Sequence, residues 1–386
     1  MAPFVQHTPP NFHLPKEFDM LRHATPMRLC GLLGLALSCV LPARAGTPVV
    51  PLAQVQEAYV RPQARIEVEP GRRINLHCQG SGSPTVVFES GLSDWSNTWA
   101  LIQPAVATRT RACSYDRPGM GASDPSPHPP TPEAVVEDLH RLLAAAGIHG
   151  PLVLVGHSLG GFYAKLFAVT HPQQVAGLVL VDPSEERLWP RVRPRLLARL
   201  GPAVIRDAMA DDADGIREGI AHFQHCASLA RVAPLEGDAY VRCTDPVRPQ
   251  LGPVINEARR QLQPLPAYQQ AQADEFAYSM YAPDAARDAR YAKLFGRLAL
   301  ADKPLVVLTH GLWDMTPPFG EADWLSWVTA HRLTAELSTR GVQRMLPMTH
   351  HNIQVEQPQA VIAAVDGVLD ALAVGQGRRD GGTATP

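Results

Sequence analysis

The chain contains Gly156-His157-Ser158-Leu159-Gly160 at the point where an apolar run gives way to a helical pattern. Residues 152–155 are typical of a short buried strand, and Phe162, Leu166 and Phe167 recur at helical spacing after the serine. The serine is therefore expected on a sharp turn between strand and helix, which strains the backbone and exposes the hydroxyl. The two glycines suit this turn, because a Cβ at either position would clash where strand and helix approach closely. The pattern predicts that Ser158 is a nucleophile.

Length and composition indicate a globular protein with a full hydrophobic core. The 386 residues are 45% hydrophobic, enough for one large domain with an insertion or for two ordinary domains. The formal net charge is only -2, so no field of a single sign points to nucleic acid or to an anionic membrane surface as a partner.

The first 45 residues resemble a leader followed by a signal peptide. Met27-Arg28 precedes an apolar run over residues 29–41, which is shorter than the roughly 20 residues that a membrane span needs. Ala43-Arg44-Ala45 then provides a small-x-small cleavage pattern. We therefore expect no stable membrane span, cleavage before Gly46, and export to the periplasm or the extracellular medium.

The pattern of elements predicts an α/β fold with a mostly parallel central sheet flanked by helices. Strand and helix signals alternate from residue 85 to residue 181, and strand signals return at 305–308 and 342–346. Between them, the chain is rich in Arg, Ala, Asp and Gln and lacks a convincing strand, which favours a helical insertion. The expected divisions are leader and signal peptide 1–45, first part of the core 46–184, helical cap 185–302, second part of the core 303–374 and disordered tail 375–386.

Four motifs follow one another along the chain: Ser83-Pro84-Thr85-Val86-Val87-Phe88-Glu89-Ser90-Gly91, Tyr115-Asp116-Arg117-Pro118-Gly119-Met120-Gly121-Ala122-Ser123, Val155-Gly156-His157-Ser158-Leu159-Gly160-Gly161, and His351-Asn352-Ile353 with Pro358. In these motifs the chain resembles the capped α/β-hydrolase family of serine esterases and lipase-like enzymes. The resemblance spans about 65–184 and 303–372. It implies an α/β-hydrolase fold with a helical cap inserted before the acid-bearing strand, and in this family the cap sets the choice of substrate.

The resemblance implies a catalytic triad whose members appear in the chain order serine, acid, histidine, each after a strand. Ser158, Asp314 and His351 obey this order. Asp182 is an alternative acid, because it follows the strand over residues 177–181 and acids occur at either of these two strand ends in the fold.

Two adjacent histidines, His350 and His351, compete for the catalytic position. The family usually has Gly-His here, and counting back from Pro358 puts His351 on the histidine and His350 on the glycine. His350 is then a departure from the family pattern whose bulk would narrow the site or have no role in it.

The resemblance also supplies an oxyanion hole, made of the backbone N–H groups of Leu92 and Leu159. Together with the triad, it implies cleavage of small-molecule carboxylic esters through an acyl-enzyme, with neither metal nor organic cofactor. An amidase, a peptidase or a lactonase would fit the same triad, and a non-catalytic secreted binding protein remains the alternative from another class. Dehalogenases and epoxide hydrolases of this fold need a carboxylate nucleophile, which Ser158 does not provide.

Removal of the signal peptide would leave an even number of cysteines, which suits an oxidising compartment: Cys78, Cys113, Cys226 and Cys243. The fold implied by the resemblance places the second and fourth strands side by side, so Cys78 is expected to pair with Cys113, unless the two stay reduced and packed. The other two share the cap and would close a short loop. His222 and His225 lie near them, but the spacing fits no standard zinc module, so a disulfide is favoured over a metal site.

Overall fold

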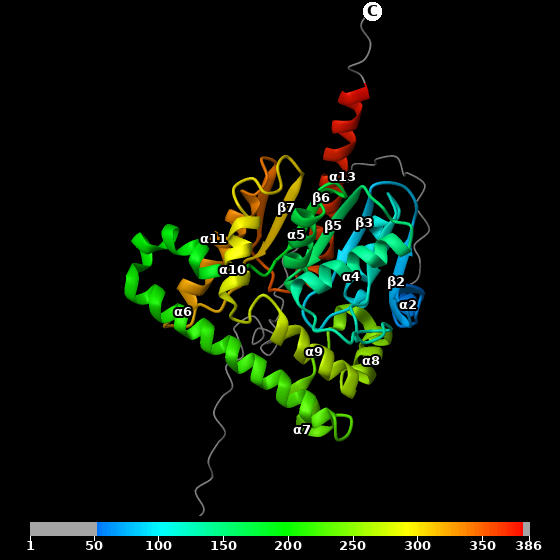
Figure 1. Cartoon of the computed structure of the whole chain (residues 1–386), viewed down its shortest axis with the longest axis horizontal. Coiled ribbons are helices and arrows are strands. Elements are labelled where there is room, and N and C mark those ends of the chain that lie inside the picture. Colours follow the sequence, from blue (N-terminus) through cyan, green and yellow to red (C-terminus); the bar gives the residue numbers. More distant parts are fainter. Residues whose placement is uncertain (1–51, 381–386) are drawn as a thin grey trace, which may run out of the picture.

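The computed structural model of the chain describes residues 52–380. The expected signal peptide and the cleavage site before Gly46 lie outside the described residues. Figure 1 shows a central sheet flanked by helices, with further helices gathered along one side of this core. Within the described part of the chain, no helix is both long and apolar enough to cross a membrane.

The central sheet has eight strands in the order β1-β2-β4-β3-β5-β6-β7-β8. β2 pairs antiparallel with β1 and β4, and every other neighbouring pair is parallel, which confirms the predicted mostly parallel sheet. The strands are β1 (Ala64–Glu69), β2 (Arg72–Gln79), β3 (Thr85–Glu89), β4 (Ala112–Tyr115), β5 (Leu152–His157), β6 (Val175–Val181), β7 (Leu305–His310) and β8 (Gly341–Leu346).

Both faces of the sheet are covered, which explains why the central strands are apolar throughout instead of alternating. In β5, Leu152 and Leu154 pack into one core, whereas Val153 and Val155 pack into the other. The first core lies against α4 (Pro132–Ala145), α5 (Leu159–Thr170) and the end of α11 (Gly320–Ala335). The second lies against η1 (Ser96–Trp99), α3 (Gln103–Val106), α12 (Ile353–Glu356) and α13 (Pro358–Asp380).

The last helix is longer than the sequence pattern indicates. α13 continues to Asp380, so residues 375–380 are helical, contrary to the expectation of a disordered tail from residue 375; residues 381–386 lie outside the described residues. Glycines at 375 and 377 suggested a helix end, but glycine inside a helix costs only about 1 kcal/mol relative to alanine.

Between β6 and β7, the described residues form helices and no strand, in agreement with the predicted helical cap. A break at Gly201, followed by Pro202, divides α6. The cap elements are α6 (Leu188–Ala230), α7 (Gly237–Cys243), η2 (Pro249–Leu251), α8 (Gly252–Leu262), α9 (Pro266–Tyr278) and α10 (Ala285–Leu294). α7, α8 and α9 lie together on one side of the core, and α2 (Leu52–Ala58) lies close to α8 (Figure 1).

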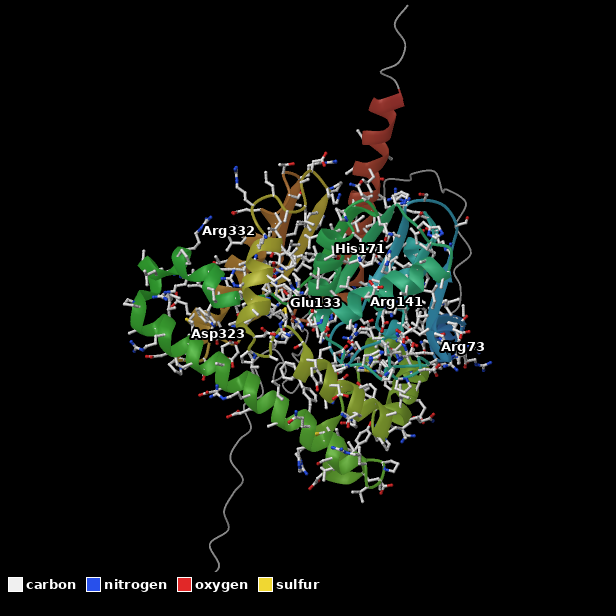
Figure 2. All side chains as sticks on the ribbon, viewed as in Figure 1. Arg73, Glu133, Arg141, His171, Asp323 and Arg332 are labelled. Atoms are coloured by element: carbon white, nitrogen blue, oxygen red, sulfur yellow. A yellow bond between two sulfur atoms is a disulfide. The ribbon has the colours of Figure 1, made fainter. Side chains whose placement is uncertain are left out.

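Polar contacts also join the cap to the core. Glu133, labelled in Figure 2, lies in the first turn of α4 and pairs with Arg290 of α10. The Tyr291 hydroxyl donates to the same carboxylate oxygen at 2.9 Å. The cap therefore contacts the helical layer that covers the sheet.

The structure contains both of the expected disulfides. Cys78 and Cys113 are direct register partners on β2 and β4, and they are bonded. Cys226 and Cys243 are bonded between α6 and α7 and close a loop with a sequence separation of 17. Since these two sulfurs are bonded to each other, they cannot act as thiolate ligands for a metal.

Candidate active site

Ser158 lies on the turn between β5 and α5, as the sequence pattern predicts. Its backbone adopts φ 51° and ψ −125°, in a region that is strained for a residue with a Cβ. A Cβ at Gly156 would lie 2.4 Å from the carbonyl oxygen of Gly160, and one at Gly160 would lie 2.3 Å from that of Ser90. The two glycines therefore allow strand, helix and neighbouring loop to meet around the serine.

A buried carboxylate and a histidine lie at the neighbouring strand ends. Asp182 directly follows β6, and its Oδ2 atom lies 2.6 Å from Nδ1 of His351 in the segment after β8. His351 is 9% exposed, and Asp182 is fully buried. Since Nδ1 faces the carboxylate, Nε2 is the ring nitrogen left for proton transfer.

Asp182 accepts three further hydrogen bonds. Nδ1 of His310, the last residue of β7, lies 2.6 Å from Oδ2, while Oδ1 accepts from the His310 backbone N–H at 3.0 Å and from Trp327 Nε1 at 3.1 Å. Burial alone would raise the pKa of Asp182, but His310 and His351 together bring this pKa well below its ordinary value. The carboxylate is thus held ionised and in a fixed orientation.

This geometry contradicts the expectation that Asp314 orients His351. Asp314 lies on the exposed loop between β7 and α11, where its carboxylate accepts hydrogen bonds from the backbone N–H and the hydroxyl of Thr316, at 2.9 and 2.5 Å. His351 has a single Nδ1–H, and that group already faces Asp182. If Asp182 is the acid, the cap follows the acid-bearing strand instead of preceding it.

The two adjacent histidines differ in their surroundings. The side chain of His350 is 45% exposed, with Nδ1 3.3 Å from Oε2 of Glu356. His351 packs on His157, the residue before the serine, with a ring centroid distance of 4.7 Å. His157 Nε2–H donates to the backbone oxygen of His351 at 3.0 Å and so ties the histidine segment to the serine turn.

His157 is also a source of pH-dependent stability. Burial, with the nearby His351, lowers its pKa from 6.5 to about 3, so it stays neutral in the folded protein and becomes protonated in the unfolded chain below pH 6.5. The contribution of His157 to folding stability is therefore greatest above pH 6.5 and falls as the pH drops toward 3. From pH 6.5 to 4.5, His157 should cost on the order of 2 kcal/mol, and His77, whose pKa burial lowers to about 4, acts in the same direction.

Urea unfolding at pH 7.5 and pH 4.5 measures this loss. We expect a lower midpoint at pH 4.5 and a smaller difference between the two pH values in His157→Gln, which cannot titrate. Equal midpoints for the wild type at both pH values would contradict the prediction.

The expected oxyanion donors belong to two segments that touch. Leu159 is the first residue of α5, and Leu92 lies in the loop that follows β3. A Cβ at Gly91 would lie 2.7 Å from Nδ1 of His157, so this loop packs directly on the serine turn. The contact fits the formation of one hole from both segments.

Two further hydroxyl groups, which the sequence patterns did not reveal, lie next to the serine. Ser184 Oγ is 3.4 Å from Ser158 Oγ, and its backbone N–H donates to the Ser158 carbonyl oxygen at 2.9 Å. The Tyr281 hydroxyl, from the cap, donates to Ser184 Oγ at 2.6 Å. Polar groups of the cap therefore reach the immediate neighbourhood of Ser158.

The cluster of Asp182, His310 and His351 also has the composition of a metal site, with donor atoms within 4.8 Å of one another. However, both Nδ1 atoms lie at hydrogen-bonding distance from the same carboxylate oxygen, 2.6 Å in each case. This is the geometry expected when two imidazole N–H groups donate to one carboxylate.

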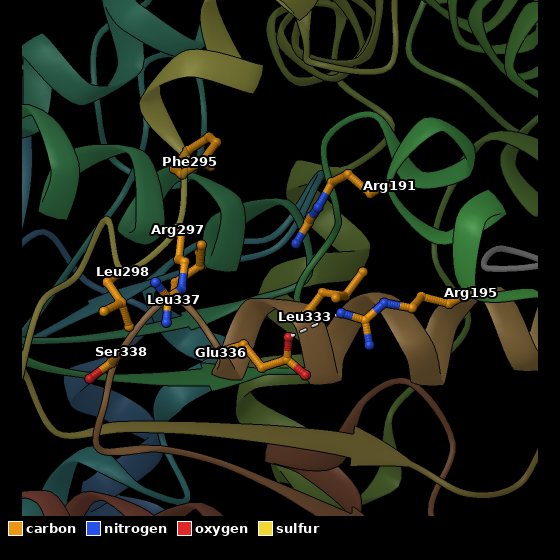
Figure 3. Close-up of a pocket in the computed structure, with 9 residues that line it drawn as sticks. All are labelled: Arg191, Arg195, Phe295, Arg297, Leu298, Leu333, Glu336, Leu337 and Ser338. Atoms are coloured by element: carbon orange, nitrogen blue, oxygen red, sulfur yellow. Dashed lines mark ion pairs between the residues drawn. The ribbon is translucent and has the colours of Figure 1, made fainter.

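A separate cavity of about 610 Å³ lies where α6 approaches α11 and the segment after α10. Figure 3 shows its lining, which includes Arg191, Arg195, Arg297 and Glu336. No lining residue belongs to the cluster around Ser158, Asp182 and His351. This cavity is therefore distinct from the candidate active site.

Comparison with known proteins bears on the fold of the chain. Residues 84–241 match the model of the α/β hydrolase fold family. A cis-3-alkyl-4-alkyloxetan-2-one decarboxylase of Xanthomonas campestris is 32% identical over 127 residues, which are 31% of this chain and 42% of that protein. The chain spans less than half the length of the curated relatives reported with it.

Solved structures resemble the chain over a larger part of its length. A hydrolase from Pseudomonas aeruginosa has a TM-score of 0.53 and 23% identity, covering 79% of this chain and 97% of that one. An esterase from Thermogutta terrifontis has a TM-score of 0.50 and 22% identity, covering 80% and 97%. At this identity the likeness shows the fold. Together with the family match over residues 84–241, it shows that the chain has the α/β-hydrolase fold.

Proposed function

We propose that the chain is a serine hydrolase that cleaves carboxylic esters with Ser158 as nucleophile, His351 as general base and Asp182 as the acid of the triad. The observation that carries this proposal is the buried 2.6 Å hydrogen bond between Asp182 and His351, adjacent to the strained turn that bears Ser158. A nucleophile, a base and a group that orients the base are the parts that acyl transfer needs.

In the proposed reaction, Ser158 Oγ attacks the ester carbonyl carbon while Nε2 of His351 takes the hydroxyl proton. The ionised Asp182 stabilises the imidazolium that forms, and the backbone N–H groups of Leu92 and Leu159 stabilise the oxyanion of the tetrahedral intermediate. His351 then protonates the leaving alcohol. Water, activated by the same histidine, attacks the acyl-enzyme and releases the acid.

A panel of paired substrates tests this function: p-nitrophenyl esters of two, four and eight carbons, the matching p-nitroanilides and a small lactone. We expect ester hydrolysis with kcat/KM at least about 100-fold above that of the matched anilides, because an amide is less electrophilic and has a poorer leaving group. Faster cleavage of anilides would favour an amidase, and faster cleavage of the lactone would favour a lactonase. A folded protein that cleaves none of them would favour the non-catalytic binding protein.

We also propose that the protein is exported. The signal-like pattern before Gly46 supports this, and so do the two disulfides, which are typical of oxidising compartments. The test is to assay fractions of cells that express the full chain with the same ester panel. We expect the activity in the periplasmic or culture fraction. Activity confined to the cytosol would contradict export.

A further inference from the structure

The loop that follows β3 runs through Ser90, Gly91, Leu92, Ser93 and Asp94 and bears the proposed oxyanion donor Leu92; we refer to it as the oxyanion loop. All five residues are buried or partly buried, and Ser93 has a positive φ of 61°. Such a conformation costs energy in a residue other than glycine and persists only where the surroundings hold it. The contacts that hold this loop therefore matter for the direction of the Leu92 N–H.

On the core side, Arg117 holds the loop by two of its carbonyl groups. The guanidinium Nη1 donates to the Ser90 carbonyl oxygen at 2.6 Å, and Nη2 donates to the Gly91 carbonyl oxygen at 2.5 Å. Nη1 also donates to Glu89 at 2.8 Å. The side chain is 3% exposed, so these charge-assisted bonds are shielded from water.

On the cap side, Glu275 of α9 holds both Arg117 and the loop. One carboxylate oxygen accepts from Arg117 Nε at 2.5 Å, and the other accepts the backbone N–H of Ser93 at 2.8 Å. Tyr268, also on α9, donates its hydroxyl to the Ser93 carbonyl oxygen at 2.7 Å. Both backbone polar groups of Ser93, the residue next to Leu92, are therefore bonded to the cap.

A second buried ion cluster fixes the end of the same loop to the cap. Asp94 accepts from Arg248 at 2.8 and 2.9 Å and from Arg259 of α8 at 2.8 Å. Arg259 in turn bonds Asp245 at 2.5 Å. Buried, charge-assisted hydrogen bonds therefore tie the loop to the cap at both Ser93 and Asp94.

We propose that Glu275 is a positioning residue for the oxyanion hole, through which the cap helps to form the catalytic site. Glu275 touches neither the nucleophile nor its histidine. It acts through Ser93 and Arg117, which hold the loop on both sides of Leu92. This inference rests on the proposed ester hydrolysis, because the hole has a role only where an oxyanion forms.

Glu275→Gln tests the proposal with little change in volume. The Gln side chain keeps only one acceptor oxygen, so either Ser93 N–H or Arg117 Nε faces an amide NH2 group. We expect kcat for the best ester to fall about 100-fold with KM within threefold, the size of effect expected for loss of one oxyanion donor. Affinity for a trifluoromethyl ketone inhibitor, which forms an oxyanion on the serine, should fall by a similar factor.

The matched control is Asp138→Asn. Asp138, on α4, is another buried carboxylate that binds an arginine, but both of its oxygens bind Arg72 of β2, in the core. We expect the control to lose stability while keeping kcat and inhibitor affinity within threefold of the wild type. Unchanged kinetics in Glu275→Gln, or equal kinetic losses in the two variants, would overturn the proposal.

Two additional measurements keep the test decisive. If Glu275→Gln fails to fold, Tyr268→Phe is the second variant: it removes only the hydroxyl bonded to Ser93 and keeps the ring packed on Trp95. We expect kcat to fall at least fivefold with KM unchanged. An unchanged kcat would overturn the proposal. If the wild type cleaves no ester, the proposed function fails, but hydrogen exchange still tests whether Glu275 holds the oxyanion loop. Backbone exchange over residues 90–94 should then be at least tenfold faster in Glu275→Gln than in the wild type or in Asp138→Asn, and unchanged exchange would refute it.

Discussion

Ser158→Ala should lose at least about 10⁴-fold in kcat for the best ester substrate, because the members of a triad act as a unit and no other group can form the acyl-enzyme. The fold should be retained. The substitution removes one hydroxyl group, keeps the Cβ and leaves the backbone strain of the turn unchanged. The measurement is steady-state hydrolysis of the ester, together with the thermal midpoint of the same preparation.

Ser338→Ala provides the matched control. Ser338 is also a buried serine, but it lies at the opposite end of the sheet, where its hydroxyl donates to the Lys303 carbonyl oxygen just before β7. It should keep activity within threefold of the wild type. If Ser158→Ala retains most of the wild-type activity, Ser158 is not the nucleophile.

The second large effect is expected for Asp182→Asn. An amide cannot accept a hydrogen bond through its nitrogen, so the substitution disfavours the His351 tautomer that carries hydrogen on Nδ1, and kcat should fall by about 10⁴-fold. Because Asp182 also binds His310 and Trp327, the thermal midpoint should fall as well. Rates are therefore compared per folded molecule, with the folded fraction taken from circular dichroism.

Asp314→Asn is the variant to compare with Asp182→Asn. Its carboxylate bonds Thr316 on an exposed loop, so activity should stay within threefold of the wild type. If Asp314→Asn is inactive while a folded Asp182→Asn is nearly as active as the wild type, then the acid belongs to the loop after β7 and the assignment to Asp182 is wrong.

The difference between these two acids illustrates where sequence patterns stop being informative. Asp182 and Asp314 both follow a strand, and β6 and β7 are neighbours whose ends lie about 5 Å apart across the sheet. Chain order does not separate them, since both lie between the serine and the histidine. What separates the two acids is the set of donors around Asp182, and two of these, His310 and Trp327, lie more than 120 residues away in the chain.

Features defined by a local pattern or by the expected order of strands were predicted more successfully. The turn at Ser158 follows from glycine spacing between a strand and a helix, and the Cys78–Cys113 bond follows from the adjacency of two strands in the expected fold. In contrast, Glu275 lies in an ordinary polar helix sequence and becomes notable only when α9 packs on the oxyanion loop, 182 residues away from it in the chain. Contacts of that range carry no signal in a single sequence.

The most direct test of the central claim, that Ser158 is an activated nucleophile, is covalent labelling of the wild-type protein by a fluorophosphonate probe, followed by peptide mapping. We expect a single modified residue, Ser158, with labelling abolished in Ser158→Ala and at least about 100-fold slower in folded Asp182→Asn, because the serine depends on the oriented histidine. Labelling at another residue, or the absence of labelling in a folded wild-type protein, would contradict the claim.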